Sequence, residues 1–116
     1  MDKLTPRIKL WLNSESAEGA FGDGKCRLLK SIETTGSLRA ASESLGISYR
    51  KAWGDLKKAQ DALGVILIEQ HRGGRQGGRT TLTEQGRRWL LAYGRFRRDV
   101  ETAVQASFDK FVGEVE

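Results

Sequence analysis

The sequence has 116 residues, a length that fits one domain or a domain with one appended element. Its hydrophobic fraction of 38% can build a modest core and excludes a disordered chain. The net charge of +5 is unevenly distributed along the chain. A basic block at 72–98 has eight arginines against Glu84, and an acidic block at 99–116 has five acids against Lys110.

A focused positive field of this kind favours a polyanion as partner, with nucleic acid first and an anionic membrane second. A merely solvated charged face is the alternative. The sequence lacks an apolar run of about 18 residues, so we expect no membrane span. The N-terminus mixes charges into its apolar positions, so we expect no signal peptide and a cytoplasmic protein.

The first elements in chain order are a strand, a loop and a helix. Residues 7–12 place Ile8, Leu10 and Leu12 on one side and predict a strand. Residues 13–24 are polar and rich in glycine, which predicts a loop. Residues 25–35 carry apolar side chains at helical spacing and predict a helix that ends before a glycine.

Two further helices follow, joined by a tight turn. Ser37 is the expected N-cap of a short helix over 38–45, and Gly46 ends it because glycine adopts the left-handed conformation at no cost. Ser48 is the next N-cap, for a helix over 49–63. Its apolar stripe is narrow and faces the core: Ala52, Leu56, Ala59 and Leu63.

The second half reads as a hairpin and a long helix. Residues 65–69 and 79–82 are strand-forming, and the segment between them is rich in glycine and arginine. Thr83, or Thr81 with Glu84 as a capping box, opens the last helix. The fold class is therefore mainly α with a small β-hairpin, a single winged helix-turn-helix domain over 1–116, with the helix-turn-helix at 37–63, the wing at 65–82 and the last helix at 83–112.

This order of elements predicts a surface for double-stranded DNA. A helix-turn-helix projects its second helix into the major groove. In this chain that helix is the third one, and it has one exposed face that can contact base edges. Glycines let the wing approach the sugar-phosphate backbone, and arginines supply the charge. The predicted DNA-binding residues are Arg39, Ser48, Tyr49, Arg50, Lys51, Trp53, Lys57, Arg72, Arg75 and Arg79.

Two other interpretations of the glycine-rich segment are disfavoured. A phosphate-binding P-loop needs G-K-[ST] before a helix, and GGRQGGRTT lacks it. An RNA-binding RGG segment would be longer and would not be bounded by strand-forming residues.

The segment from Leu28 to Leu90 resembles the ModE family of molybdate-responsive regulators, and more distantly the LysR-type winged helices. The shared pattern is G-I-S-Y-[RK]-x-A-W at Gly46 to Trp53, with the turn residues and the final L-T-x-x-G: Ala40, Ala41, Leu45, Ile47, Ser48, Leu82, Thr83 and Gly86. The resemblance covers roughly residues 7–110 and implies a dimeric repressor or activator on an inverted-repeat operator. ModE-like regulators carry oxyanion-binding domains after this module, and we expect no molybdate or tungstate binding in this chain.

Several residues have ordinary structural interpretations. Trp53 and Tyr49 are spaced for mutual packing on one helix. Core or scaffold packing is the favoured role of Trp53, and contact with a base or sugar is the alternative. Cys26 is expected to be a small buried hydrophobic residue. With one cysteine and one histidine, His71, we expect no metal site, no cofactor and no enzyme activity.

The last helix carries an apolar stripe much longer than a small winged body can cover. We expect this stripe to form a homodimer interface, and closing the domain's own core is the alternative. The predicted interface residues are Trp89, Tyr93, Phe96, Val100, Val104, Phe108 and Phe111.

A second function from another class is a protein-interaction or assembly module whose basic face meets an acidic partner. Such a module has no need of an arginine-rich wing together with a basic third helix. The presence of both favours DNA.

Overall fold

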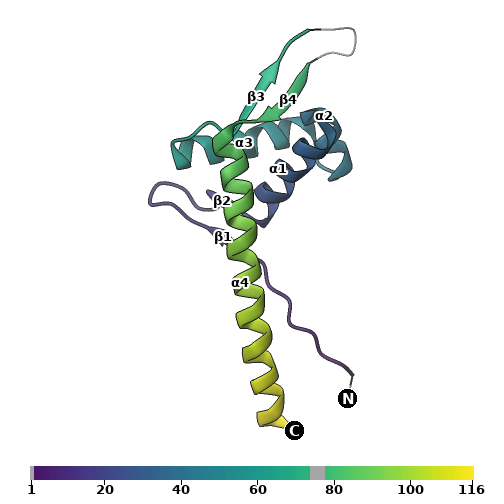
Figure 1. Ribbon diagram of the computed structural model, residues 1–116, viewed down its shortest axis with the longest axis vertical. Helices are drawn as coiled ribbons and strands as arrows, with labels where there is room; N and C mark the ends of the chain where they lie inside the picture. The colour runs from purple at the N-terminus through teal and green to yellow at the C-terminus, as the bar shows by residue number, and fades with distance from the viewer. Residues whose placement is uncertain (1, 74–77) are drawn as a thin grey trace.

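The computed structural model describes residues 2–73 and 78–116. Three helices form a compact body, a hairpin rises from one side of it, and the last helix extends away from the opposite side (Figure 1). The elements in chain order are β1 (Trp11–Leu12), β2 (Phe21–Gly22), α1 (Asp23–Thr35), α2 (Leu38–Ser44), α3 (Tyr49–Leu63), β3 (Ile68–His71), β4 (Arg79–Leu82) and α4 (Glu84–Val115). This architecture confirms the predicted fold class, a winged helix-turn-helix.

Side-chain caps fix where the helices begin. The hydroxyl oxygens of Ser37, Ser48 and Thr83 each accept a hydrogen bond from the backbone amide three residues ahead, at 3.0, 3.0 and 2.9 Å. Each bond satisfies an amide that has no partner inside its own helix. Gly46 turns the chain between α2 and α3 with a φ of 69°, a conformation that other residues rarely adopt. The predicted caps and turn are confirmed.

The core lies where α1, α2 and α3 meet the first turns of α4. Ala52, Leu56 and Ala59 are fully buried on α3, as their spacing predicts, and belong to one core cluster with apolar residues of α1 and α2. Phe21 is also fully buried, and its ring lies 5.2 Å from those of Trp89 and Tyr93 on α4. These aromatic contacts attach α4 to the body.

The N-terminal strand differs from its prediction. Only Trp11–Leu12 of residues 7–12 form a strand, because the partner strand β2 offers only Phe21–Gly22. The amide of Leu10 donates instead to the Asp23 carboxylate, at 3.0 Å. The expected loop at 13–24 therefore contains β2 and the first two residues of α1.

The hairpin is the predicted wing, with β4 at the predicted residues and β3 displaced toward the loop. β3 and β4 pair antiparallel, with Ile68 opposite Leu82 and His71 opposite Arg79. β3 begins at Ile68 rather than at residue 65. Thr80, opposite Gln70 in the ladder, is buried. Its amide donates to Gly36 O (2.9 Å) and its hydroxyl accepts from Leu38 N (3.3 Å).

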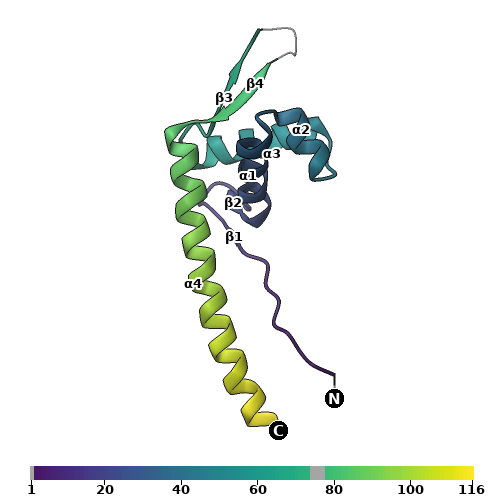
Figure 2. The same cartoon turned by 45° about the vertical axis from the view of Figure 1, so that its right-hand side comes forward.

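α4 is the longest element. Its 32 residues span about 48 Å at 1.5 Å per residue, and they account for most of the longest dimension of the molecule, 62 Å. The helix begins one residue later and ends three residues later than predicted. Its second half projects beyond the body, and the N-terminal segment runs off in the same general direction (Figure 2). Among the helices described, none has the length and apolarity to cross a membrane.

Candidate nucleic-acid interface

The outer face of α3 presents the residues that the sequence predicts for DNA contact. Tyr49, Arg50, Trp53 and Lys57 are all exposed, opposite the buried stripe of the same helix. Trp53 is 40% exposed and therefore lies outside the core. The packing interpretation favoured for Trp53 by sequence is wrong as far as the core is concerned. The exposed part of its indole can contact another molecule.

Tyr49 is paired with an arginine from the preceding helix. The Arg39 guanidinium lies over the Tyr49 ring, 4.9 Å from its centroid. This cation–π contact joins the start of α3 to α2 and leaves the N–H groups at the edge of the guanidinium available. Arg39 and Tyr49 thus form one unit beside Arg50, and the unit can present positive charge to a phosphate.

Lys51 lies on a different flank of α3. Successive residues are separated by about 100° around a helix, so Lys51 is displaced from Arg50 toward Asp55, on the side away from Tyr49. Its ammonium pairs with the Asp55 carboxylate at 3.0 Å, and both residues line a cleft beside the N-terminal segment. An exposed pair of this kind contributes only about 0.3–0.5 kcal/mol. The structure therefore separates Lys51 from the group around Arg50.

The described part of the wing carries two of its three predicted arginines. Arg72 and Arg79 are exposed and stand near each other at the end of the β3–β4 ladder, where Arg79 lies opposite His71. Arg75 lies outside the described residues. His71 Nε2 lies 3.0 Å from Thr81 Oγ1, so the imidazole belongs to the hairpin. Within residues 2–73 and 78–116, the metal-ligating residue types form no group of three.

α4 divides the predicted dimer residues into two sets. Tyr93 is only 4% exposed, and Trp89 packs against the core, so both belong to the protomer's own interior. Phe96 is 38% exposed, and Phe111 is exposed as well. Val100, Val104 and Phe108 lie between them on the projecting part of the helix, each half-buried. The apolar stripe therefore closes the core at its start and faces solvent afterwards.

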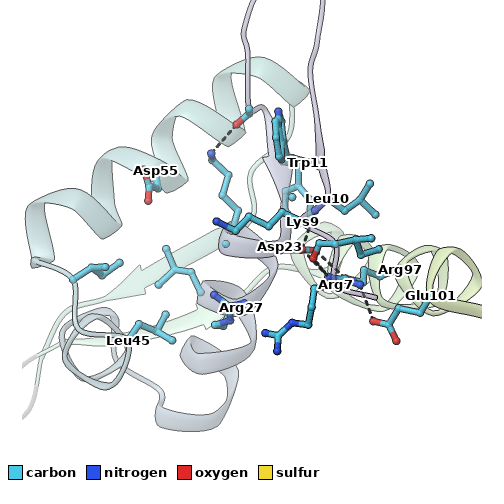
Figure 3. Close-up of a pocket in the computed structure, with 18 of the residues that line it drawn as sticks. Arg7, Lys9, Leu10, Trp11, Asp23, Arg27, Leu45, Asp55, Arg97 and Glu101 are labelled. Carbon is cyan, nitrogen blue, oxygen red and sulfur yellow. Dashed lines mark hydrogen bonds and ion pairs between the residues drawn. The ribbon is translucent and has the colours of Figure 1, made fainter. Parts of the chain in front are cut away.

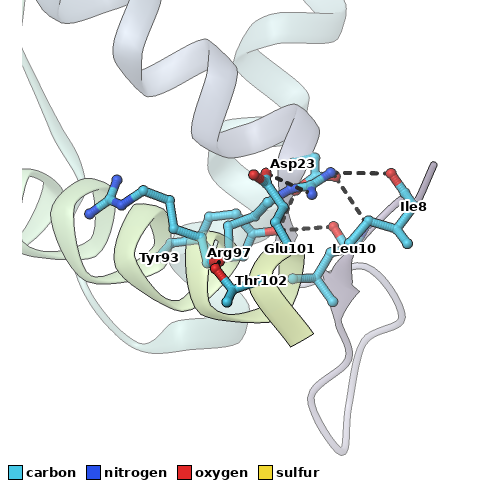
Figure 4. A network of polar contacts seen from close by, with 8 residues as sticks. Ile8, Leu10, Asp23, Tyr93, Arg97, Glu101 and Thr102 are labelled. Carbon is cyan, nitrogen blue, oxygen red and sulfur yellow. Dashed lines mark hydrogen bonds and ion pairs between the residues drawn. The ribbon is translucent and has the colours of Figure 1, made fainter. Parts of the chain in front are cut away.

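A polar network that the sequence did not reveal joins three segments of the chain (Figure 4). Asp23, at the start of α1, accepts hydrogen bonds from Leu10 N (3.0 Å), Tyr93 OH (2.6 Å) and Arg97 Nη2 (3.0 Å). Arg97 also donates to Ile8 O at 3.1 Å and to Glu101 at 2.9 Å. The network ties the N-terminal segment and α4 to the body at the point where both leave it.

The network shifts the pKa values of its members. Burial raises the pKa of Asp23, but the hydrogen bonds from Arg97, Tyr93 and Leu10 outweigh it, so the net pKa lies below its usual value. Burial and the neighbouring carboxylate raise the pKa of Tyr93. The hydrogen bond to Asp23 raises the pKa of Arg97. At neutral pH the three groups are therefore a carboxylate, a neutral phenol and a guanidinium.

Cys26 lies on α1 close to this network. It is half-buried and packs against the core, in line with its predicted role as a small hydrophobic residue. Burial raises the pKa of its thiol, which keeps the thiol protonated and unreactive.

A helix-turn-helix with an exposed second helix, followed by an arginine-bearing antiparallel hairpin, defines a winged helix-turn-helix protein. Residues 25–87 match the family described as bacterial regulatory helix-turn-helix proteins of the lysR family. The chain belongs to this family, which consists of regulatory proteins rather than enzymes.

Relatives of known name share the same region. The molybdenum transport protein ModE of Azotobacter vinelandii is 35% identical over 91 residues, covering 78% of this chain and 32% of that protein. The transcriptional regulator ModE of Haemophilus influenzae is 34% identical over 105 residues, covering 90% of this chain and 41% of that protein. The chain thus spans about a third of the length of the curated relatives it matches.

Solved structures share the fold. The DNA-binding domain of CbnR in complex with DNA has a TM-score of 0.55 and 21% identity, covering 78% of this chain and 95% of that one. The DNA-binding domain of BenM with benA site 1 DNA has a TM-score of 0.57 and 19% identity, covering 80% of this chain and 97% of that one.

Proposed function

We propose that this chain binds an inverted-repeat operator as a homodimer and serves as the DNA-binding module of a transcriptional regulator. The observation that carries the proposal is the combination of an exposed, basic and aromatic face on α3 with an arginine-bearing wing on the same body. The names of the ModE relatives and the DNA complexes of CbnR and BenM point the same way.

In this proposal α3 enters the major groove and the wing lies against the backbone or the adjacent minor groove. Arg50 and Trp53 face base edges, and the stacked Arg39–Tyr49 pair holds a phosphate beside them. Arg72 and Arg79 add charge without reading sequence. Lys51 takes a phosphate only by leaving Asp55, which costs little because that pair is exposed.

The homodimer is supported by the projecting half of α4. A helix that leaves its body with Phe96, Phe111 and Val115 exposed presents apolar area that a second copy can cover. Two such helices packed together form a two-fold dimer whose recognition helices lie about one DNA turn, or a multiple of it, apart.

The ModE relatives have names that refer to molybdenum or to regulation, and the matched region is about a third of their length. We propose that this region supplies DNA binding. That it binds no molybdate or tungstate remains a prediction.

A titration on DNA tests the proposal. The purified chain is expected to shift an inverted-repeat duplex selected from random sequence more strongly than a scrambled duplex, with affinity falling steeply as salt rises. Weak binding to all duplexes, together with binding to an acidic protein partner, would favour the interaction module instead.

Light scattering tests the dimer. The wild type is expected to be dimeric at micromolar concentration, and Phe96→Glu with Val104→Glu is expected to be monomeric because two charges would be buried between the helices. Leu91→Glu is the matched control, since Leu91 is exposed and apolar but lies on the opposite side of α4. A monomeric wild type, or a double variant that stays dimeric, would refute the interface.

A further inference from the structure

The N-terminal segment leaves the body as an extended arm, defined here as residues 2–9. It is held at its root, where Ile8 O accepts from Arg97 and Leu10 O accepts from Asp23 N at 2.9 Å. Within the described part of the chain, residues 2–7 make no hydrogen bond. Leu4 is 53% exposed. The arm therefore carries an apolar side chain into solvent without a strand partner or a packing surface of its own.

An open cleft lies below the body, between the arm and the part of the body that carries Leu45 and Asp55 (Figure 3). Pro6 to Trp11 and the α4 residues Arg97, Glu101, Val104 and Gln105 also line it. The cleft has a volume of about 920 Å³. The arm therefore borders open space along one flank.

The charges of the arm and of α4 are complementary. The arm carries Lys3, Arg7 and Lys9 against Asp2. Residues 99–116, the last part of α4 and its end, carry five acids against Lys110. Asp99 and Glu101 already pair with Arg95 and Arg97 of the same helix, so the attraction of a basic extended segment falls on Asp109, Glu114 and Glu116. The apolar residues of that segment can then cover the exposed end of the stripe.

We infer that the arm of each copy closes over the α4 helix of a second copy of this chain. Leu4 and Pro6 pack on the apolar stripe of the second copy, and Arg7 and Lys9 lie beside its acidic residues. The arm then lies beside the paired α4 helices, along the edge of the stripe. The inference rests on the proposed homodimer and adds an interaction surface that α4 pairing alone does not include.

Cross-linking between two differently tagged chains distinguishes this arrangement from an arm that folds onto its own helix. Both chains carry Cys26→Ser; one carries Arg7→Cys, and the other carries Gln105→Cys or Asp109→Cys. Mixing them with a short bis-maleimide is expected to give a covalent heterodimer. Lys58→Cys on α3 replaces Arg7→Cys as the control, and it is expected to give only the background of random collisions.

Two outcomes would overturn the inference. The first is a cross-link confined to one chain when that chain carries both Arg7→Cys and the α4 cysteine. The second is a heterodimer yield no greater than that of the Lys58→Cys control in a chain that is dimeric by light scattering.

The dimer dissociation constant gives a second readout. Reversing the arm charges with Lys3→Glu, Arg7→Glu and Lys9→Glu is expected to raise this constant by about tenfold or more, through lost attraction and lost apolar burial. The matched control reverses three exposed lysines elsewhere: Lys30, Lys57 and Lys58. Equal effects of the two triple variants would overturn the inference.

The two proposals fail separately. A monomeric wild type overturns both. A dimer that Phe96→Glu with Val104→Glu dissociates, while the arm variants leave its dissociation constant unchanged, overturns the arm alone.

Discussion

Arg97 Nη2 and Asp23 Oδ2 lie 3.0 Å apart, although 74 positions separate the two residues in the sequence. Both side chains are largely shielded from solvent, and Tyr93 joins the pair from α4 through its hydroxyl. Because these contacts lie where α4 leaves the body, they set the direction of the helix proposed to carry the dimer. The spacing of the two DNA half-sites would then depend on Asp23, Tyr93 and Arg97.

The buried phenol of Tyr93 gives the simplest test of the group. Tyr93→Phe removes a hydrogen bond to a carboxylate and is expected to lower the free energy of unfolding by about 1.5–3 kcal/mol. Tyr49→Phe, at an exposed tyrosine, is the control and is expected to change it by less than about 0.5 kcal/mol. Urea unfolding measures both. A Tyr93 variant as stable as the control would mean that the bond contributes nothing.

Stability is expected to depend on pH through Asp23. The pKa of this carboxyl is lower in the folded state than in the unfolded state, so its contribution is present above the unfolded value and is lost as pH falls through the folded value. The difference in unfolding free energy between wild type and Asp23→Asn should therefore shrink as pH falls below about 4. Asp61→Asn, at an exposed carboxylate, is the matched control. A difference independent of pH would contradict the role of Asp23.

Gly86 is expected to be intolerant of a side chain. It is buried in the first turn of α4, and a Cβ there would overlap the carbonyl oxygen of Leu67. Gly86→Ala should destabilise the fold by about 1–3 kcal/mol through overpacking. Gly113→Ala, in the same helix with open space around it, should stabilise it by about 0.5–1 kcal/mol. Thermal unfolding of the two variants checks both signs.

Arg50 is expected to read sequence. Arg50→Ala should weaken binding to the selected operator by about 1–3 kcal/mol and reduce discrimination against a mismatched base pair. Arg95→Ala, which removes an exposed arginine from α4, should leave discrimination intact. Fluorescence anisotropy on matched and mismatched duplexes provides the measurement. Unchanged discrimination in the Arg50 variant would exclude base contact.

The wing is expected to contribute charge rather than specificity. Arg72→Gln with Arg79→Gln should weaken binding to every duplex and flatten the slope of log affinity against log salt by up to about two contacts. Arg88→Gln with Arg95→Gln removes the same charge from α4 and should leave the slope nearly unchanged. If the wing variant kept the wild-type slope, the wing would not touch DNA.

The helices could be predicted from sequence because their limits are local. Ser37, Ser48 and Thr83 each cap a helix through an atom three residues away, and Gly46 makes its turn without help from the rest of the fold. The strand predicted over 7–12 was too long, because the length of a strand depends on its partner and only two residues of β2 are available.

The site was predictable in part for the same reason. The spacing of the α3 stripe identifies which side chains face outward, Arg50 among them, but not that Arg39 stacks on Tyr49 or that Lys51 turns toward Asp55. No local pattern in the sequence predicts the contacts of Asp23, since its partners lie on α4 and in the N-terminal segment. Contacts between residues so far apart depend on how the helices pack.

The two hydrogen bonds of Thr80 attach the second strand of the wing to the turn between α1 and α2. Wing and recognition helix are therefore both attached to the same three-helix body, and in the proposed complex the duplex must adapt to their separation. The cost of that adaptation depends on the flexibility of the DNA, which is greatest at pyrimidine–purine steps. Operator preference should then extend to base pairs that no side chain contacts, selected for how easily they bend.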